Sequence, residues 1–393
     1  MSYQDGISRR QFVKFSSSFA IAGAFASLAG CSSSSGSSSA STSASAEASG
    51  SASASASASE SASASASTAS SAAAATQTIT DLKGATVEVP AEINRIADLW
   101  HAHNQVVLML GAGDKLVGTT ENFKNMPWSA IVYPRLPEVE TLVVGSGAGE
   151  VNYEEALKLE PDVVFASDDE VTETARKQGL AALNVGFIDY QGLRDNVNLT
   201  AKVLGGDAIE IAKEWEGLLD DNIALVADRM KDVTGKKKRI LHIANANDFT
   251  MVDGPKTIVE EWIKLAGGEI AIDKEGNRLE VTAEEILNSD PDVVIIGNAG
   301  PEDVERFKAD EAFAGLRAIQ EGNVYANPSG VFPWDRYSGE GALQVLWAAK
   351  QLNPELFKDI DMVQQTKDFY MQFYGCKLTD EQANMILAGE RPK

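Results

Sequence analysis

The amino-acid sequence predicts an α/β protein of two βαβ lobes with mostly parallel sheets, joined by one long helix and with a ligand cleft between them. Residues 151–167 (VNYEEALKLEPDVVFAS) align without gaps on residues 281–297 (VTAEEILNSDPDVVIIG), and eight of 17 positions are identical. In each copy a short helical pattern ends at a proline and an apolar run follows, which is typical of a buried parallel strand. Between the copies, residues 207–232 carry apolar side chains at helical spacing, broken only by Gly217, which predicts the connecting helix.

The first 31 residues have the features of an export signal. Arg9 and Arg10 precede the apolar stretch Phe15–Ala29, which is too short and too rich in serine and glycine for a comfortable transmembrane helix. The paired arginines, followed by QFVK, resemble a twin-arginine (Tat) signal peptide. The closing LAGC resembles the lipobox of bacterial lipoproteins, whose cysteine becomes the lipidated first residue. We therefore expect Cys31 to anchor the exported chain to the outer face of the cell membrane.

Residues 32–78 are nearly all serine and alanine and contain no large apolar residue. Such a composition cannot form a core, so we expect a disordered tether. The remaining chain, about 315 residues, suits two lobes better than one core. We assign residues 79–206 to an N-terminal lobe, 207–233 to the bridging helix and 234–393 to a C-terminal lobe.

In each lobe, strand and helix patterns alternate. The N-terminal lobe has strand patterns at residues 95–97, 116–118, 163–166 and 183–189 (LNVGFID), and a helix pattern at 105–111. The C-terminal lobe has a strand pattern at 238–247 (KRILHIANAN), a helix at 255–268 with a glycine stop, and an amphipathic helix beginning near Ser338. Gly145, Gly147 and Gly149 lack the spacing of a dinucleotide-binding fingerprint, so we expect a loop there.

Composition and motifs exclude several function classes. The formal net charge of −23 argues against nucleic-acid binding, which needs a basic face. There is no Gly-x-Ser-x-Gly elbow, no His-Glu-x-x-His helix and no nucleophilic Cys-His set, and the chain has three histidines, so we expect no enzyme and no intrinsic cofactor. With Cys31 lipidated, Cys376 has no intrachain partner and we expect it to pack.

The stretch DLWHAHNQVV places candidate ligand residues at a strand-to-helix turn of the N-terminal lobe. Trp100, His101 and His103 lie there, at the carboxyl end of a strand, where open α/β sheets bind ligands. Their two-residue spacing differs from that of helical zinc ligands. We expect one histidine, with Trp100, to line the cleft and complete the coordination of a metal that arrives chelated. Which histidine faces the cleft stays open, as does a purely structural turn.

Other candidates lie in loops and at strand ends. They are Asn122 and Phe123 in the loop 119–128, Asn245 beyond a strand, and Asn298 after the strand of the second repeat copy. Each asparagine could also be a local turn former.

The loop NPSGVFPWDRY carries Trp334, Arg336 and Tyr337 into a helix. An arginine flanked by aromatics suits a flat, anionic, delocalised ligand. The alternative is a surface ion pair between Arg336 and Asp335 with Trp334 in the core.

Taken with the lipobox and the two-lobed pattern, four segments resemble the ABC-importer substrate-binding proteins for iron-siderophores, haem and cobalamin, a family with a helical bridge. They are TDLKGATVEVPAEINRIA, the paired EEALKLEPDVV and EEILNSDPDVV, and FYGCKLTDEQANMILAG. The resemblance implies that Glu154 and Glu284, each seven residues before the proline of its copy, dock on arginines of the permease. Both could instead be ordinary exposed glutamates at helix starts.

The resemblance therefore implies an extracytoplasmic, lipid-anchored and monomeric lipoprotein that captures a metal chelate and delivers it to a permease and its ATPase. An iron-siderophore or related iron complex is the first expectation, and haem, cobalamin or a nickel chelate are alternatives. A chaperone for metal or haem that never meets a permease is the alternative of another class.

Overall fold

The computed structural model describes residues 75–145 and 149–393. The predicted export signal, Cys31, residues 32–74 of the predicted tether and Gly147 lie outside the described residues. The first described element is strand β1 (Thr76–Thr80), which pairs antiparallel with β2 (Thr86–Pro90). The last three residues assigned to the tether, 76–78, therefore belong to this hairpin.

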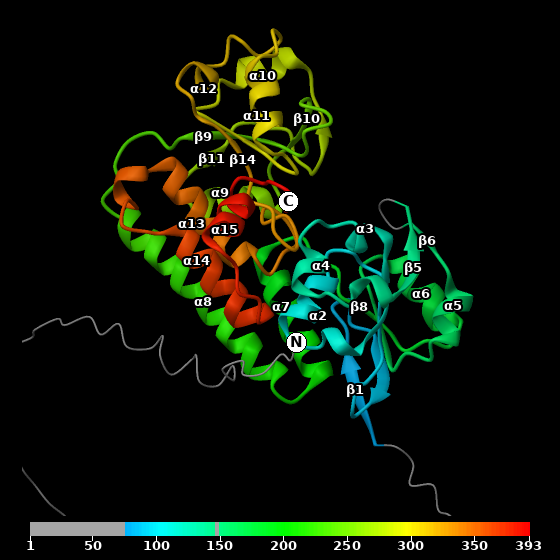
Figure 1. Cartoon of the computed structure of the whole chain (residues 1–393). Coiled ribbons are helices and arrows are strands. Elements are labelled where there is room, and N and C mark those ends of the chain that lie inside the picture. Colours follow the sequence, from blue (N-terminus) through cyan, green and yellow to red (C-terminus); the bar gives the residue numbers. More distant parts are fainter. Residues whose placement is uncertain (1–74, 146–148) are drawn as a thin grey trace, which may run out of the picture. The chain divides into compact units, whose positions relative to one another are not determined.

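The N-terminal lobe is built on a six-stranded sheet in which every neighbouring pair except β5 and β6 is parallel. In spatial order the strands are β6 (Glu150–Val151), β5 (Glu140–Val144), β4 (Leu116–Thr120), β3 (Ile96–Asp98), β7 (Val163–Ala166) and β8 (Ala182–Asn184). The helices of this lobe are α2 (Asn104–Met109), α3 (Glu121–Lys124), α4 (Ser129–Val132), α5 (Tyr153–Lys158), α6 (Asp169–Lys177) and α7 (Tyr190–Leu204), with 3-10 turns η1 (Gly113–Lys115) and η2 (Leu136–Glu138). Figure 1 shows this lobe in blue to green.

The C-terminal lobe has a second six-stranded sheet, with parallel strands at its centre. Its strands are β12 (Leu279–Glu280), β10 (Met251–Asp253), β9 (Arg239–Ile243), β13 (Val293–Ile296) and β14 (Val324–Ala326) in spatial order, with β11 (Glu269–Ile270) pairing parallel to β9. The helices are α9 (Ile258–Leu265), α10 (Ala283–Ser289), α11 (Pro301–Lys308), α12 (Arg317–Gln320), α13 (Gly341–Leu352), α14 (Met362–Phe369) and α15 (Asp380–Leu387), with a 3-10 turn η3 (Pro354–Leu356) and a π-helical turn η4 (Tyr370–Tyr374).

The sequence repeat is also a structural repeat. Strand β7 lies between β3 and β8 in the first sheet, and β13 lies between β9 and β14 in the second. Helices α5 and α10 end in the same way, because Glu160 and Asp290 adopt left-handed φ angles of 44° and 39° directly before the prolines. The predicted α/β fold with two lobes is confirmed.

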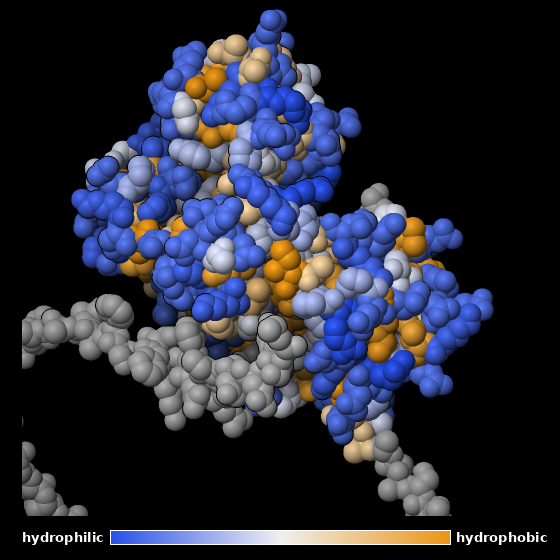
Figure 2. All heavy atoms as spheres, viewed as in Figure 1, coloured by the Kyte–Doolittle hydropathy of each residue, from blue (hydrophilic) through white to orange (hydrophobic). Residues whose placement is uncertain are grey.

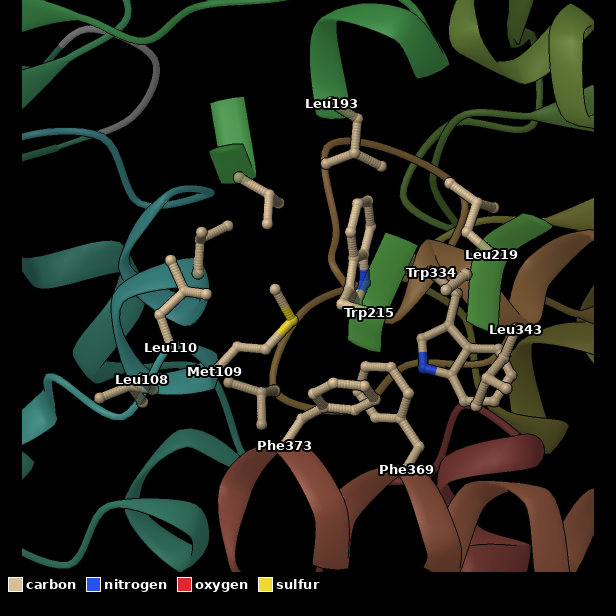
Figure 3. Packing of buried hydrophobic residues seen from close by; sticks show 14 of the residues in the cluster. Leu108, Met109, Leu110, Leu193, Trp215, Leu219, Trp334, Leu343, Phe369 and Phe373 are labelled. Atoms are coloured by element: carbon tan, nitrogen blue, oxygen red, sulfur yellow. The ribbon is translucent and has the colours of Figure 1, made fainter. Parts of the chain in front are cut away.

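Helix α8 (Ala208–Met230) is the long connecting helix, and it is not the only link between the lobes. One hydrophobic core includes side chains of both lobes, and Figure 3 shows Met109 of α2 and Trp215 of α8 gathered with Leu343 of α13 and Phe373 of η4. The indole Nε1 of Trp215 donates to the carbonyl of Gly339 at 2.7 Å. A shared core resists separation of the lobes more than a single helix would.

Two local expectations differ from the structure. The apolar run LNVGFID is strand only to Asn184, and residues 185–189 form a loop that leads into α7. Asparagine and glycine end the strand because the side chain of Asn184 accepts a hydrogen bond from the nitrogen of Gly186 at 2.9 Å. The helix expected from Ser338 begins at Gly341.

Candidate functional site

A cavity of about 470 Å³ lies at the carboxyl ends of β3, β7 and β8. Trp100 follows β3, Ser167 follows β7, and the loop after β8 supplies the longest stretch of the wall. The lining residues are Leu82, Lys83, Trp100, Ser167, Gly186, Phe187, Ile188, Asp189, Gly192, Asp195 and Tyr337. Of these, Tyr337 alone comes from the C-terminal lobe, so the cavity is formed by both lobes.

Three aromatic side chains form a triangle at this cavity. The ring centroids of Trp100 and Phe187 are 5.5 Å apart, those of Trp100 and Tyr337 are 5.8 Å apart, and those of Phe187 and Tyr337 are 5.6 Å apart. Phe187 meets Trp100 and Tyr337 edge to face, and Trp100 and Tyr337 are tilted relative to each other, so no pair is stacked. All three side chains are partly exposed. Their faces can therefore cover an apolar or delocalised ligand.

Lys83 is held at the cavity by the turn between β1 and β2. One carboxylate oxygen of Asp81 accepts hydrogen bonds from the backbone nitrogens of Lys83 and Ala85, both at 2.9 Å. The other oxygen accepts from the nitrogen of Asn184 at 3.0 Å and from Arg176. Burial alone would raise the pKa of Asp81, but these hydrogen bonds lower it, so the carboxylate stays charged and fixes the turn to β8.

The charged residues around the cavity are of both signs. Lys83 is the one basic lining residue, and Asp189 and Asp195 are acidic. Asp189 caps α7 by accepting from the nitrogen of Gly192 at 2.7 Å. At the same helix end, Glu261 of the other lobe accepts from the nitrogen of Tyr190 at 2.7 Å. The donors at this helix start are therefore taken up by the chain's own carboxylates.

Behind Tyr337, Arg336 belongs to a buried ionic network. Its guanidinium donates to Asp253 at 2.6 Å and lies 3.4 Å from Asp335 and 3.1 Å from the amide oxygen of Asn277. His242 joins the same two carboxylates, with its Nδ1 2.7 Å from Asp253 and its Nε2 3.1 Å from Asp335. Burial lowers the pKa of His242, but the two carboxylates outweigh it and raise that pKa overall. The two carboxylates of this network are therefore shared by Arg336 and His242.

The loop before Tyr337 is also held by buried Glu340. Its carboxylate accepts hydrogen bonds from Tyr370 Oη at 2.6 Å, the nitrogen of Phe332 at 2.9 Å and Trp334 Nε1 at 3.1 Å. Burial raises the pKa of Glu340 to about 7, despite these donors. A Cβ at Gly330 would lie 2.0 Å from both Glu340 Oε1 and Tyr370 Oη, so this position requires glycine.

The two histidines of the opening turn have different surroundings. His103 is 1% exposed, with Nδ1 2.7 Å from Asp98 and Nε2 2.8 Å from the hydroxyl of Thr200. Both of its ring nitrogens are occupied, so it is not available to a ligand. His101 is partly exposed and packs against Phe332 at 5.7 Å, and burial lowers its pKa. His101 is therefore the less enclosed histidine of the pair, and it is not among the residues that line the cavity.

Of the other candidate ligand residues, Trp100 and Tyr337 line the cavity, and several do not. Phe123 and Trp334 are 0% and 1% exposed and belong to the core. The guanidinium of Arg336 is not free to bind a carboxylate of a ligand, because it is already paired with Asp253 and Asp335.

The three candidate asparagines support local backbone. Asn122 donates to the carbonyl of Gly145 at 3.0 Å, and Asn245 accepts from the nitrogen of Asn247 at 2.9 Å. Asn298 has a left-handed φ of 47°. The turn-forming alternative therefore accounts for their contacts.

All the lining residues except Trp100 and Tyr337 escaped the sequence reasoning, among them Lys83, Phe187 and Ile188. Phe187 and Ile188 were concealed inside an apolar run that predicts a strand. The glycine and asparagine in NVG were a usable signal for the strand end, since both favour turns. Lys83 lies in a hairpin turn, and nothing in the sequence shows that this turn packs on β8.

The predicted docking residues lie on the first turns of the repeated helices, Glu154 on α5 and Glu284 on α10, and both are exposed. Within residues 75–145 and 149–393, no helix is long and apolar enough to cross a membrane. The same part of the chain holds no group of three or more histidine, cysteine or acidic side chains placed to bind a metal ion.

Residues 96–330 match a family model described as "Periplasmic binding protein". The molybdate-binding protein MolA of Haemophilus influenzae is 27% identical over 321 residues, 75% of this chain and 90% of that protein. A putative ABC transporter substrate-binding lipoprotein of Bacillus subtilis, YhfQ, is 24% identical over 275 residues, 63% of this chain and 82% of that protein. The crystal structure of a periplasmic solute binding protein from Veillonella parvula superposes with a TM-score of 0.70 at 28% identity, covering 80% of this chain and 97% of that one.

Proposed function

The chain belongs to the periplasmic binding protein family, and from that premise we propose that it captures a metal chelate outside the cell and delivers it to an importer. It is a substrate-binding protein of an ABC transporter. The ligand that we propose is an iron-siderophore or a related iron complex. The observation that carries this choice is the triangle of Trp100, Phe187 and Tyr337 at the cavity.

The size and charge of the cavity support an organic chelate over a bare anion. A cavity of about 470 Å³ falls in the range that takes drug-sized ligands. The single basic residue, Lys83, can meet one acidic group of a chelate, and the aromatic rings can cover its organic shell. The relative from Haemophilus influenzae is named a molybdate-binding protein. For this chain, the cavity lining among the described residues holds two acidic residues and no arginine, which disfavours a small oxyanion.

A titration of the purified chain followed by tryptophan fluorescence tests the ligand. Ferric siderophores, haem, cobalamin, nickel-histidine and molybdate are added in turn. Because Trp100 lies at the cavity, a bound iron chelate should quench its emission, and the Trp100→Phe variant should lose most of that response. Binding of cobalamin, nickel-histidine, haem or molybdate without any response to iron chelates would replace our ligand assignment.

Delivery to a permease is proposed through Glu154 and Glu284. Two exposed carboxylates, one on each lobe, can pair with two cationic groups and so orient the complex. Charge reversal at both positions should abolish ligand uptake by cells while the purified variant still binds its ligand. Unchanged uptake would favour the alternative, a chaperone that acts without a permease.

The proposed location is the outer face of the membrane, with Cys31 as the lipid attachment site and the chain acting as a monomer without enzymatic chemistry. The paired arginines are proposed to direct export. In cell fractionation the Cys31→Ser variant should move from the membrane to the soluble extracytoplasmic fraction. A membrane-bound variant would show that another segment anchors the chain.

A further inference from the structure

The repeat places two leucines on the surface at equivalent positions. Figure 2 shows a mostly hydrophilic face with apolar residues in small groups. Among the described residues, the exposed large apolar side chains are Val144, Leu157, Ile188, Ile209, Val233, Leu287 and Leu356. Only Leu157 and Leu287 in this set are related by the repeat, and they are 40% and 37% exposed.

Each leucine shares a helix face with a candidate docking glutamate. Leu157 lies three residues after Glu154 on α5, and Leu287 lies three residues after Glu284 on α10. Residues three apart on a helix are surface neighbours. The repeat therefore presents the same acidic and apolar pair twice, once on each lobe.

Matching contacts hold the two helices in the same position on their sheets. Asn152 and Thr282 cap the helix starts by accepting from the nitrogens of Glu155 and Glu285. At the other end, Arg95 donates to the carbonyl of Leu159 and Arg239 to that of Ser289.

The aspartates after the two prolines complete the match. Asp162 and Asp292 accept from the backbone nitrogens of Arg95 and Arg239, both at 2.8 Å. Both leucine-glutamate pairs are thus presented by fixed backbone, and rigid presentation lowers the entropy lost on binding.

Resting on the proposed delivery to a permease, we propose that Leu157 and Leu287 are the apolar centres of two equivalent docking sites. The partner that fits is a membrane permease with two equivalent halves, each offering a basic side chain beside an apolar depression. The paired chemistry supports this partner, because a duplicated acidic and apolar surface complements a surface that presents its own features twice. Burial of the leucines adds an attraction that salt does not screen.

Site-specific photo-crosslinking in the source cells identifies the partner. A photoreactive amino acid replaces Leu157, Leu287 or, as a control of similar exposure, Leu356, which is 38% exposed and lies outside the repeat. We expect the permease polypeptide to be crosslinked from the first two positions and not from the third. Crosslinks to a second copy of this chain or to lipid, with none to a permease, would overturn the proposal.

Affinity for the purified permease complex in lipid nanodiscs then measures the contribution of each leucine. Leu157→Ser and Leu287→Ser should each weaken binding about threefold, and the double variant about tenfold, while Leu356→Ser should not change it. If the leucine variants bind normally while the reversals Glu154→Lys and Glu284→Lys prevent binding, the leucine proposal fails and the glutamate proposal stands. If the reversals also bind normally, the docking function itself fails.

Discussion

The two lobes contribute to the cavity in unlike ways. The N-terminal lobe supplies all but one of the lining residues, through three strand ends, a hairpin turn and the start of α7. The C-terminal lobe supplies Tyr337, and behind it lie Arg336, Asp253 and Glu340 in buried hydrogen-bonded contacts. The N-terminal lobe therefore supplies most of the surface that a ligand can contact, and the C-terminal lobe supplies Tyr337 on a loop held by buried contacts.

This difference predicts where substitutions affect stability and where they affect binding. A buried ionic network depends on every partner, since removing one leaves a charge without compensation. Partly exposed aromatic rings at a cavity can be removed with less effect on folding. The C-terminal lobe should thus respond through stability and the N-terminal lobe mainly through affinity.

The largest effect is expected for Asp253→Ala. One oxygen of Asp253 serves both His242 and Arg336, and the other accepts from the nitrogen of Arg278 at 2.8 Å. The substitution should lower the free energy of unfolding by about 3–5 kcal/mol, measured by denaturant unfolding. Lys83→Ala, at an exposed turn of the other lobe, should cost less than about 0.5 kcal/mol. Equal losses in the two variants would contradict the division between lobes.

The pH dependence of stability comes next, through Glu340. Its pKa is about 7 in the folded protein against an ordinary 4.5, so the folded state holds the extra proton between those values. Stability from this group is complete below about pH 4.5 and is lost as pH rises through 7, by at most about 3 kcal/mol. Glu340→Gln should flatten this part of the profile, measured by thermal unfolding across pH.

The shifted pKa values of Asp253 and His242, also in the C-terminal lobe, do not obscure the effect of Glu340→Gln on the pH profile. The lowered pKa of Asp253, held down by His242 and Arg336 against the effect of its burial, gives stability that is lost only in more acidic solution. The raised pKa of His242 acts in the same direction as that of Glu340 but is unchanged in the variant. An unaltered slope in Glu340→Gln would show that Glu340 does not titrate in this range.

Substitutions of His101 and His103 compare the effects of two positions within the N-terminal lobe on stability and on ligand binding. His103→Ala leaves Asp98 and Thr200 without their buried partner and should lower the free energy of unfolding by about 2 kcal/mol. His101 is partly exposed and lies outside the cavity lining, so His101→Ala should change stability little and weaken capture of a ferric chelate less than a change at a lining ring does. Unfolding curves and ligand titration separate the two effects. The reverse pattern would move the ligand contact to His103.

Phe187→Ala tests the contact surface itself. The ring meets both Trp100 and Tyr337, so its removal opens the triangle and should weaken ligand binding about tenfold. Ile188→Ala, at a side chain that is 70% exposed beside it, is the matched control and should weaken binding less. Isothermal titration with a ferric siderophore measures both. A larger loss at Ile188 would place the ligand at the rim rather than against the rings.

The sequence predicted the fold because the repeat and the apolar periodicities are local signals. Val163–Ala166 and Val293–Ile296 are fully buried central strands, as their continuous apolar runs require. The site was predicted less completely. The rule of strand ends pointed to Trp100, which lines the cavity, and its role in ligand binding stays a prediction. Residues that reach the cavity only through packing, such as Lys83 in the turn between β1 and β2, leave no local pattern.

Arg336 illustrates why a residue type alone does not assign a role. Beside two aromatics, an arginine suits an anionic ligand, and the sequence also left open an ion pair with Asp335. The structure adds Asp253, which is 83 positions away in the chain and lies on β10. Because a long-range partner decides whether the charge is free, no pattern of neighbouring residues could reveal it.

The smallest expected effect concerns a charge difference between the docking helices. Lys158 lies 3.1 Å from Glu154, with both side chains largely exposed, whereas the repeat has Asn288 at the matching position in the C-terminal lobe. Glu154 must therefore leave a partner before it binds a cationic group. Lys158→Asn should strengthen permease binding by about twofold or less, and Asn288→Lys should weaken it to a similar extent. Both changes should shrink at high salt, because exposed charges are screened. Affinity measurements in nanodiscs at low and high salt check this, and shifts in the same direction for both variants would show that the two lobes do not dock by the same chemistry.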